Sequence, residues 1–76
     1  MNIKLFDTVI LKADIPNKGL CVGDMGAVVE LYEPDGLEIE FVTGSGKTQA
    51  LVTLNIADVR LITHTDILAV RSLNAA

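Results

Sequence analysis

The sequence is poor in the residue types on which many functions depend. Its 76 residues include no tryptophan, one tyrosine, two phenylalanines, one histidine and one cysteine. Because Cys21 is alone, no disulfide can form within the chain, and a reducing cytoplasm is the simplest expected location. A groove for proline-rich peptides needs an aromatic lining that so few rings do not supply. His64, Cys21 and Asp66 are not spaced as a catalytic or metal-binding set, so we expect no enzyme activity, cofactor or metal site.

The sequence also lacks any long apolar run. None approaches the roughly 18–20 residues of a membrane-spanning helix, and residues 1–11 include Asp7 and no signal-peptide cleavage site. We therefore expect a single soluble domain without membrane insertion. Half of the residues (50%) are nonetheless hydrophobic, which indicates either a dense core or apolar surface for a partner. The net charge of −4 disfavours nucleic acid and suits a basic protein partner.

What the sequence does contain is a series of short apolar runs separated by turn signals, which is typical of a small all-β fold. Strands are expected over residues 6–12, 27–33, 37–41, 49–54 and 59–62. Pro16 and Gly19 interrupt the chain with a long irregular loop, and Pro34-Asp35-Gly36 supplies a turn. The layout predicts a five-stranded SH3-like β-barrel over residues 1–62.

Two of the expected strands differ in how regularly their apolar and polar residues alternate. Residues 37–41 alternate strictly, so Leu37, Ile39 and Phe41 are predicted to point inward and the intervening glutamates into water. Residues 27–32 give no cleanly polar face, so one side must join the core and the other needs cover from the C-terminal segment or from another protein. Asn55 is expected to cap a single helical turn before the last strand.

The apolar period changes in residues 63–76. Thr63 or Thr65 could cap a short helix with an apolar face formed by Ile67, Leu68, Val70 and Leu73. About ten residues of helix are marginal in water. This extension is therefore expected to dock on the barrel, to dock on another chain, or to fray.

The segment Gly44-Ser45-Gly46-Lys47-Thr48 resembles the phosphate-binding loop of nucleotide hydrolases. That loop requires a further glycine five positions before its second one, and Phe41 stands there instead. The loop must also open a helix, whereas a strand-like run follows here. We interpret the segment as a glycine-rich hairpin loop.

An acidic hairpin is the most distinctive charged feature. It carries no base among its acids, which are Glu30, Glu33, Asp35, Glu38 and Glu40. One interpretation is a solvated face that discourages edge-to-edge aggregation. The other is a surface that attracts a basic partner.

Several segments, in their order and spacing, resemble a known family: Gly19-Leu20, Gly23-Asp24-Met25-Gly26-Ala27-Val28-Val29, Glu38-Ile39-Glu40-Phe41, Ala50-Leu51-Val52-Thr53-Leu54 and Asp58-Val59-Arg60. The chain is similar over about residues 5–62 to the small bacterial proteins catalogued as domain of unknown function 4926. The resemblance implies an SH3-like barrel and a suspected role as antitoxin or immunity partner of a small toxin. No functional residues are established for that family.

Two weaker likenesses give alternatives. The "LVTL" run and the glycine-rich start of the second strand are similar to SH3-like accessory subunits of the cyanobacterial NADH-dehydrogenase-like complex, which implies an attachment module. Residues 23–28 resemble the Gly-Asp-x-Gly-x-Val start of KOW-type barrels, which implies weak nucleic-acid binding, although the acidic hairpin would repel phosphates.

We therefore predict a cytoplasmic protein-interaction module that masks a basic toxin, with self-association as a further option. The acids steer the partner and exposed apolar residues hold it. The predicted partner-binding residues are Glu30, Glu33, Glu38, Glu40, Val29, Leu31, Ile67, Val70 and Leu73.

Overall fold

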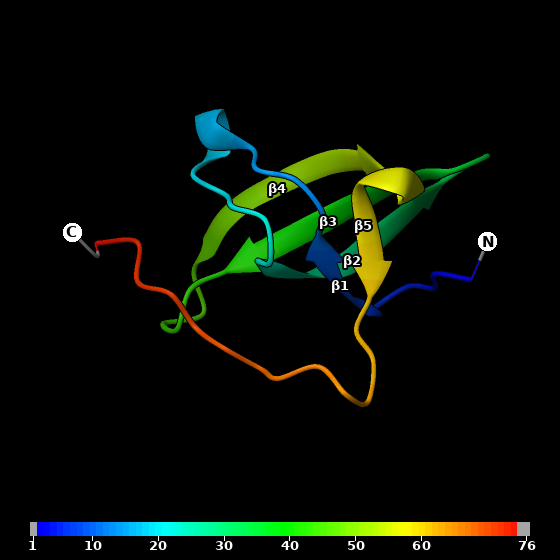
Figure 1. The fold of residues 1–76 in the computed structure, drawn as a ribbon. Coiled ribbons are helices and arrows are strands. Elements are labelled where there is room, and N and C mark those ends of the chain that lie inside the picture. Colours follow the sequence, from blue (N-terminus) through cyan, green and yellow to red (C-terminus); the bar gives the residue numbers. More distant parts are fainter. Residues whose placement is uncertain (1, 75–76) are drawn as a thin grey trace.

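The computed structural model describes residues 2–74 and has an all-β fold (Figure 1). Its elements follow one another as β1 (Thr8–Leu11), η1 (Pro16–Lys18), β2 (Met25–Tyr32), β3 (Gly36–Val42), β4 (Thr48–Asn55), η2 (Ile56–Asp58) and β5 (Val59–Leu61). η1 and η2 are single 3-10 turns. The strands form one antiparallel sheet in the order β4-β3-β2-β1-β5. The prediction of five strands and a small all-β fold is confirmed.

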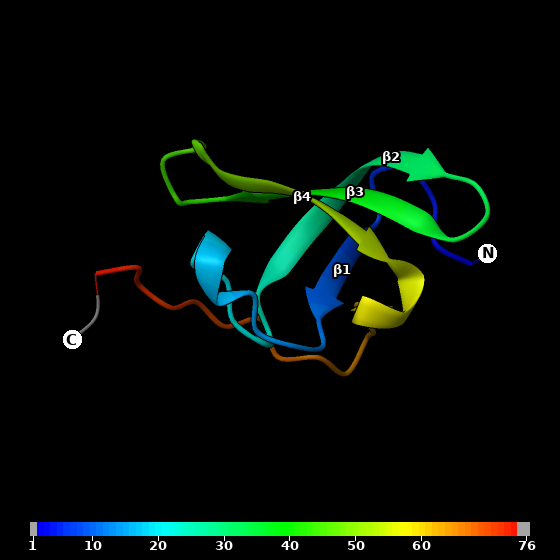
Figure 2. The ribbon, with the colours of Figure 1, turned by 90° about the horizontal axis from the view of Figure 1, so that it is seen from above.

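The sheet is curled, but no pairing between β4 and β5 closes it within residues 2–74. These two strands are its opposite edges, and only the three residues of η2 separate them along the chain. The sheet must bend so that the end of β4 meets the start of β5, as Figure 2 shows. The barrel predicted from the sequence is therefore an open one, joined at one corner by η2.

The core lies on the concave side of this sheet. Leu37 and Ile39 are fully buried and Phe41 is 3% exposed, so the prediction that these three residues point inward is confirmed. Val9 of β1 and Val28 of β2 are also fully buried against them.

A β-bulge at Val29 explains why β2 gives no clean alternation. Val28 pairs with Ile39 and Glu30 with Glu38, so Val29 is an extra residue without its own partner in β3. The bulge changes which parity faces the core: Val28 is inward before it, and Leu31 pairs with Leu37 after it. Sequence periodicity cannot follow a strand through such an insertion.

Gly26 leaves the space in the core that the side chains of Ile39 and Phe41 fill. A Cβ atom at this position would lie 2.5 Å from Cγ2 of Ile39 and 2.9 Å from Cε1 of Phe41. Since φ at Gly26 is not positive, the backbone conformation itself does not require glycine. Glycine is required here because any larger side chain would collide with Ile39 and Phe41.

The turns follow their sequence signals. Gly19 has a φ of 69° and ends η1. Asn55 accepts a hydrogen bond from the Ala57 amide while Asp58 accepts one from the Asn55 amide, which forms a capping box and confirms Asn55 as a cap. The segment with Lys47 forms the loop of the β3–β4 hairpin, not the start of a helix.

The short helix considered for the residues after 62, as one of several outcomes, is not formed in the described residues. Residues 62–74, called the C-terminal segment below, contain turns and extended chain but no helix. Figure 1 shows this segment, orange to red, running along the sheet toward the β3–β4 loop. A helix of this length gains little by itself, and side-chain bonds described below hold the segment in its extended form. Residues 75 and 76 of the predicted helix range lie outside the described residues.

Candidate protein-interaction surface

The charged residues are divided unevenly between two parts of the fold. We call residues 25–55 (β2, β3, β4 and their connections) the acidic meander. Lys47 is its one base, against the five acids Glu30, Glu33, Asp35, Glu38 and Glu40. The other five acids and five bases cancel. The net charge of −4 therefore resides entirely in the meander.

The five acids outside the meander all have structural roles. Each accepts a hydrogen bond from a backbone amide nearby: Asp7 from Lys4, Asp14 from Val22, Asp24 from Cys21, Asp58 from Asn55 and Asp66 from Thr63. These bonds fix loops and turns. Among the described acids of the meander, Glu30 also accepts a hydrogen bond from a backbone amide, that of its neighbour Leu31, at 3.2 Å. Most of the acids that fix loops and turns are thus distinct from the acids that give the fold its net charge.

Glu38 and Glu40 of β3 are held in place by neutral donors. The Thr53 hydroxyl donates to Oε1 of Glu38, and the Thr48 hydroxyl donates to Oε2 of Glu40 at 2.6 Å. Both donors belong to β4, so both carboxylates lean toward that strand. Because hydroxyl groups carry no charge, this arrangement orients the two carboxylates without neutralising them.

Glu30 and Glu33 belong to the β2 side of the β2–β3 hairpin and its turn. Glu30 is exposed and stands directly opposite Glu38 across the two strands, an arrangement of like charges that is unfavourable. Tyr32 lies nearby and donates to Glu38 at 3.4 Å; desolvation and the charges of Glu38 and Glu30 raise the pKa of its phenol. Glu33 is exposed in the turn, where no residue of the described chain donates a hydrogen bond to its carboxylate. The hairpin therefore concentrates negative charge at some cost to its own stability.

The predicted apolar contact residues differ in accessibility. Val29 is half-buried in the bulge, and Leu31 is 37% exposed. Ile67 and Val70 of the C-terminal segment are 91% and 98% exposed, and Leu73 is 47% exposed. Only the last three form part of a markedly exposed apolar stretch.

The structure does not bring the predicted residues into one patch. In both ribbon views the β2–β3 turn, next to Glu33, and the end of the C-terminal segment lie at opposite ends of the molecule (Figures 1 and 2). Glu30, Leu31 and Glu33 belong to the end of the hairpin at the β2–β3 turn. Val70 and Leu73 instead line a cleft with Val42 at the other end of β3, the end toward which Glu40 lies.

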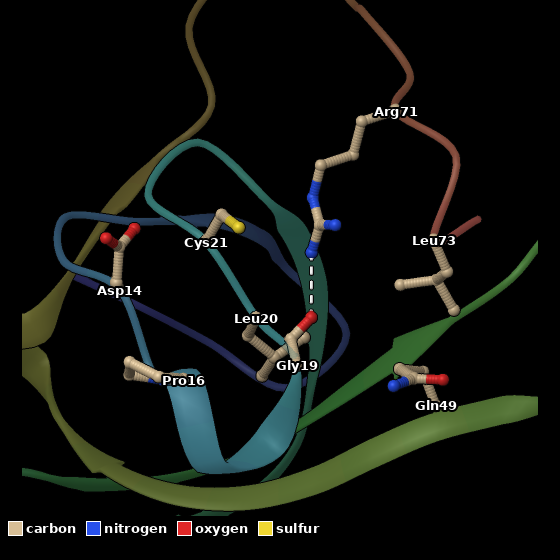
Figure 3. Close-up of a pocket in the computed structure, with 8 residues that line it drawn as sticks. All are labelled: Asp14, Pro16, Gly19, Leu20, Cys21, Gln49, Arg71 and Leu73. Carbon is tan, nitrogen blue, oxygen red and sulfur yellow. Dashed lines mark hydrogen bonds between the residues drawn. The ribbon is translucent and has the colours of Figure 1, made fainter. Parts of the chain in front are cut away.

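Arg71 anchors the C-terminal segment to the β1–β2 loop. Its Nε and Nη2 donate to the two carboxylate oxygens of Asp24 at 2.8 and 2.6 Å, and Nη2 also donates to the Gly19 carbonyl at 2.8 Å. Figure 3 shows this side chain entering a cleft between the segment and the loop, lined by Asp14, Pro16, Leu20, Cys21, Gln49 and Leu73. The hydrogen bond with Arg71 holds the pKa of Asp24 below its usual value. The cleft is therefore occupied by the Arg71 side chain.

A second ion pair fixes the beginning of the segment. Arg60 of β5 donates two hydrogen bonds to Asp66 at 2.9 and 2.8 Å. The Thr63 amide and hydroxyl also donate to Asp66. The Arg60 guanidinium and these bonds hold the pKa of Asp66 well below its usual range. The segment is thus held at 66 and at 71, with Ile67 and Val70 exposed between.

Sequence reasoning missed both anchors. Asp24 accepts a 2.8 Å bond from the Cys21 amide within its own turn, but its partner Arg71 is 47 positions away and was not found. The available signal was the presence of two arginines and several aspartates in the sequence. Composition alone could not show which arginine binds which aspartate.

Among residues 2–74, no three histidine, cysteine or acidic side chains gather as metal ligands would. In the same part of the chain, no helix has the length and apolar character needed to cross a membrane.

Comparison with known proteins identifies the family. A family model described as "Domain of unknown function (DUF4926)" matches residues 5–61. The chain belongs to this family. No curated protein and no solved structure matches significantly. The matched region includes the whole sheet and the acidic meander, and it ends before the C-terminal segment.

Proposed function

We propose that this member of the family is a non-enzymatic, cytoplasmic binding module whose acidic meander captures a basic protein, and that it acts as an antitoxin or immunity partner. The observation that supports the proposal is the division of the acids. Those outside the meander all bind backbone amides and are balanced by bases, whereas those inside it, of which Glu30 binds the amide of Leu31, carry the full net charge of −4. A surface that needed only solubility would not require this separation.

The two groups of candidate residues would have different tasks. The carboxylates of the exposed Glu30 and Glu33 and of the half-buried Glu38 and Glu40 attract a basic partner over about a Debye length and raise the association rate. Apolar contact then slows dissociation, and the exposed side chains of Ile67 and Val70 provide it on the C-terminal segment. A basic toxin covered in this way would lose access to its own target.

The identity of the partner separates this proposal from its rivals. An affinity-tagged chain is expected to co-purify from its native cell with one small basic protein, and to relieve the growth defect when that protein is expressed. Recovery of a large membrane-associated assembly would instead support the attachment module. Binding of RNA at physiological salt would support the nucleic-acid alternative.

Association kinetics test the role of the acids. The variant Glu38→Gln with Glu40→Gln removes two charges and keeps acceptors for the threonine hydroxyls. It is expected to lower the association rate several-fold, and up to about tenfold, at low salt. The variant Asn2→Lys with Asn17→Lys changes the net charge equally at exposed positions outside the meander. Equal slowing by both variants would contradict the assignment of steering to the meander.

A further inference from the structure

The outer edge of β4 is open. β4 is the last strand of the sheet, and its eight residues contain neither a charged residue nor a proline. No described residue outside β3 hydrogen bonds to the backbone of residues 48–54. In an antiparallel pair, every second residue directs its N–H and C=O groups away from its neighbour. A row of free donors and acceptors therefore lines this edge.

The opposite edge of the sheet, formed by β5, is protected against the addition of another strand. β5 has three residues, and beyond it the bond from the Ile62 amide to the Thr8 carbonyl continues the pairing with β1 by one residue. Arg60, at the centre of β5, is charged and bound to Asp66. Short length and charge are common protections of an edge strand. β4 has neither.

The chemistry beside the open edge is acidic. The carboxylates of Glu38 and Glu40 are bound by Thr53 and Thr48 of β4, which draws them from β3 toward the edge. A strand added to β4 would lie about 4.8 Å from it. Basic side chains on the convex face of that strand would then reach both carboxylates.

A second copy of this chain is a poor occupant. If the β4 strands of two copies paired, the Glu38 and Glu40 carboxylates of each copy would face those of the other across the paired edges. They would be separated by one or two strand spacings of about 4.8 Å. Like charges at such positions are unfavourable. The charge pattern selects a basic strand instead.

We propose that β4 is a docking edge to which the basic partner adds a β-strand, with alternate lysine or arginine side chains over Glu38 and Glu40. This inference rests on the proposed function and specifies how the partner binds. Main-chain hydrogen bonds along residues 48–55 would supply affinity, and the two carboxylates would select the sequence. The other face of the incoming strand would carry apolar residues beside the half-buried Ala50 and Leu54.

The test uses the full chain and a synthetic probe, an octapeptide with blocked ends that alternates lysine and valine. In NMR titrations we expect shifts concentrated in the amides of residues 48–55, and a dissociation constant in the range of about 0.1–1 mM. Replacing both Glu38 and Glu40 by glutamine is expected to weaken binding about five- to tenfold. A peptide that alternates glutamate and valine is expected not to bind.

Two N-methylated forms of the probe isolate the main-chain bonds. One form is methylated on the main-chain nitrogens of its lysine residues, and the other on the main-chain nitrogens of its valine residues. Each form therefore loses the main-chain N–H groups along one edge of the strand and keeps every charged side chain. Strand addition uses one edge of the peptide only, so one form should bind like the parent and the other should not. Equal binding by all three peptides overturns the docking edge but leaves an acidic capture surface, and with it the proposed function, intact.

Two other results also overturn the inference. The first is absence of binding by the parent peptide at millimolar concentration; the proposed function is then still decided by partner capture. The second is a concentration-dependent shift of residues 48–55 without peptide, which would make a second copy the occupant.

Discussion

Gly26→Ala is the sharpest test of the packing described above. The new methyl group would lie 2.5 Å from Cγ2 of Ile39 and 2.9 Å from Cε1 of Phe41, where ordinary contacts are 3.4–4 Å. Ile39 is fully buried and Phe41 is 3% exposed, so neither has free space to move into. Overpacking of this kind typically costs about 1–3 kcal/mol. Alanine also reduces the entropy of the unfolded chain, which offsets about 0.4–1 kcal/mol.

The expected net loss for Gly26→Ala is about 1–2 kcal/mol. In a domain of this size each kcal/mol lowers the melting temperature by about 4–8 °C, so a decrease of about 5–15 °C is expected by differential scanning calorimetry. Urea unfolding should show a lower midpoint with an unchanged m-value.

Gly44→Ala is the matched control for this prediction. An added Cβ at Gly44 meets nothing within 4 Å, and φ there is not positive. This variant gains the entropy effect without the collision, so it should equal or exceed the stability of the wild type. If Gly26→Ala were as stable as Gly44→Ala, the close packing of the Ile39 and Phe41 side chains against Gly26 would be refuted.

Three further predictions concern charges. Arg71 lowers the pKa of Asp24, so the ion pair stabilises the fold above the unfolded-state pKa of about 4. This stabilisation is lost as the pH falls through the lower pKa of the folded state. NMR should show residues 67–74 becoming mobile on acidification, and the variant Arg71→Gln should show that mobility already at pH 6. Glu30→Gln removes a like charge opposite Glu38 and should raise the free energy of unfolding by about 0.2–1 kcal/mol, whereas a decrease would assign Glu30 a structural role. ATP titrated by calorimetry should give no binding heat, and binding that disappears in Lys47→Ala would contradict the hairpin interpretation.

The parts of the fold that depend on local patterns could be predicted from the sequence. Strict alternation identified Leu37, Ile39 and Phe41 as core residues, and turn chemistry placed Asn55 as a cap. Both depend on residues within a few positions of one another. The missing glycine at Phe41 was also enough to predict a hairpin loop instead of a nucleotide-binding loop.

The parts that depend on contacts between distant residues could not. The bulge at Val29 is visible only once β2 is paired with β3. The C-terminal segment has the period of a helix, but its conformation is governed by the bonds of Asp66 and Arg71 to distant parts of the chain. The predicted apolar residues Ile67 and Val70 are exposed as expected, yet the segment that carries them ends at the opposite side of the molecule from the β2–β3 turn.

The separation of charge also makes the molecule an electric dipole. With a net charge of −4 in residues 25–55 and none in the remainder, the centre of charge is displaced from the centre of mass. A nearby positive charge therefore exerts a torque as well as an attraction, and turns the meander toward itself before contact. Screening limits this rotation to about the last 8–10 Å of the approach, a distance short beside the 39 Å length of the molecule. Salt should accordingly reduce the fraction of encounters that begin in the correct orientation, even where it leaves the final complex unchanged.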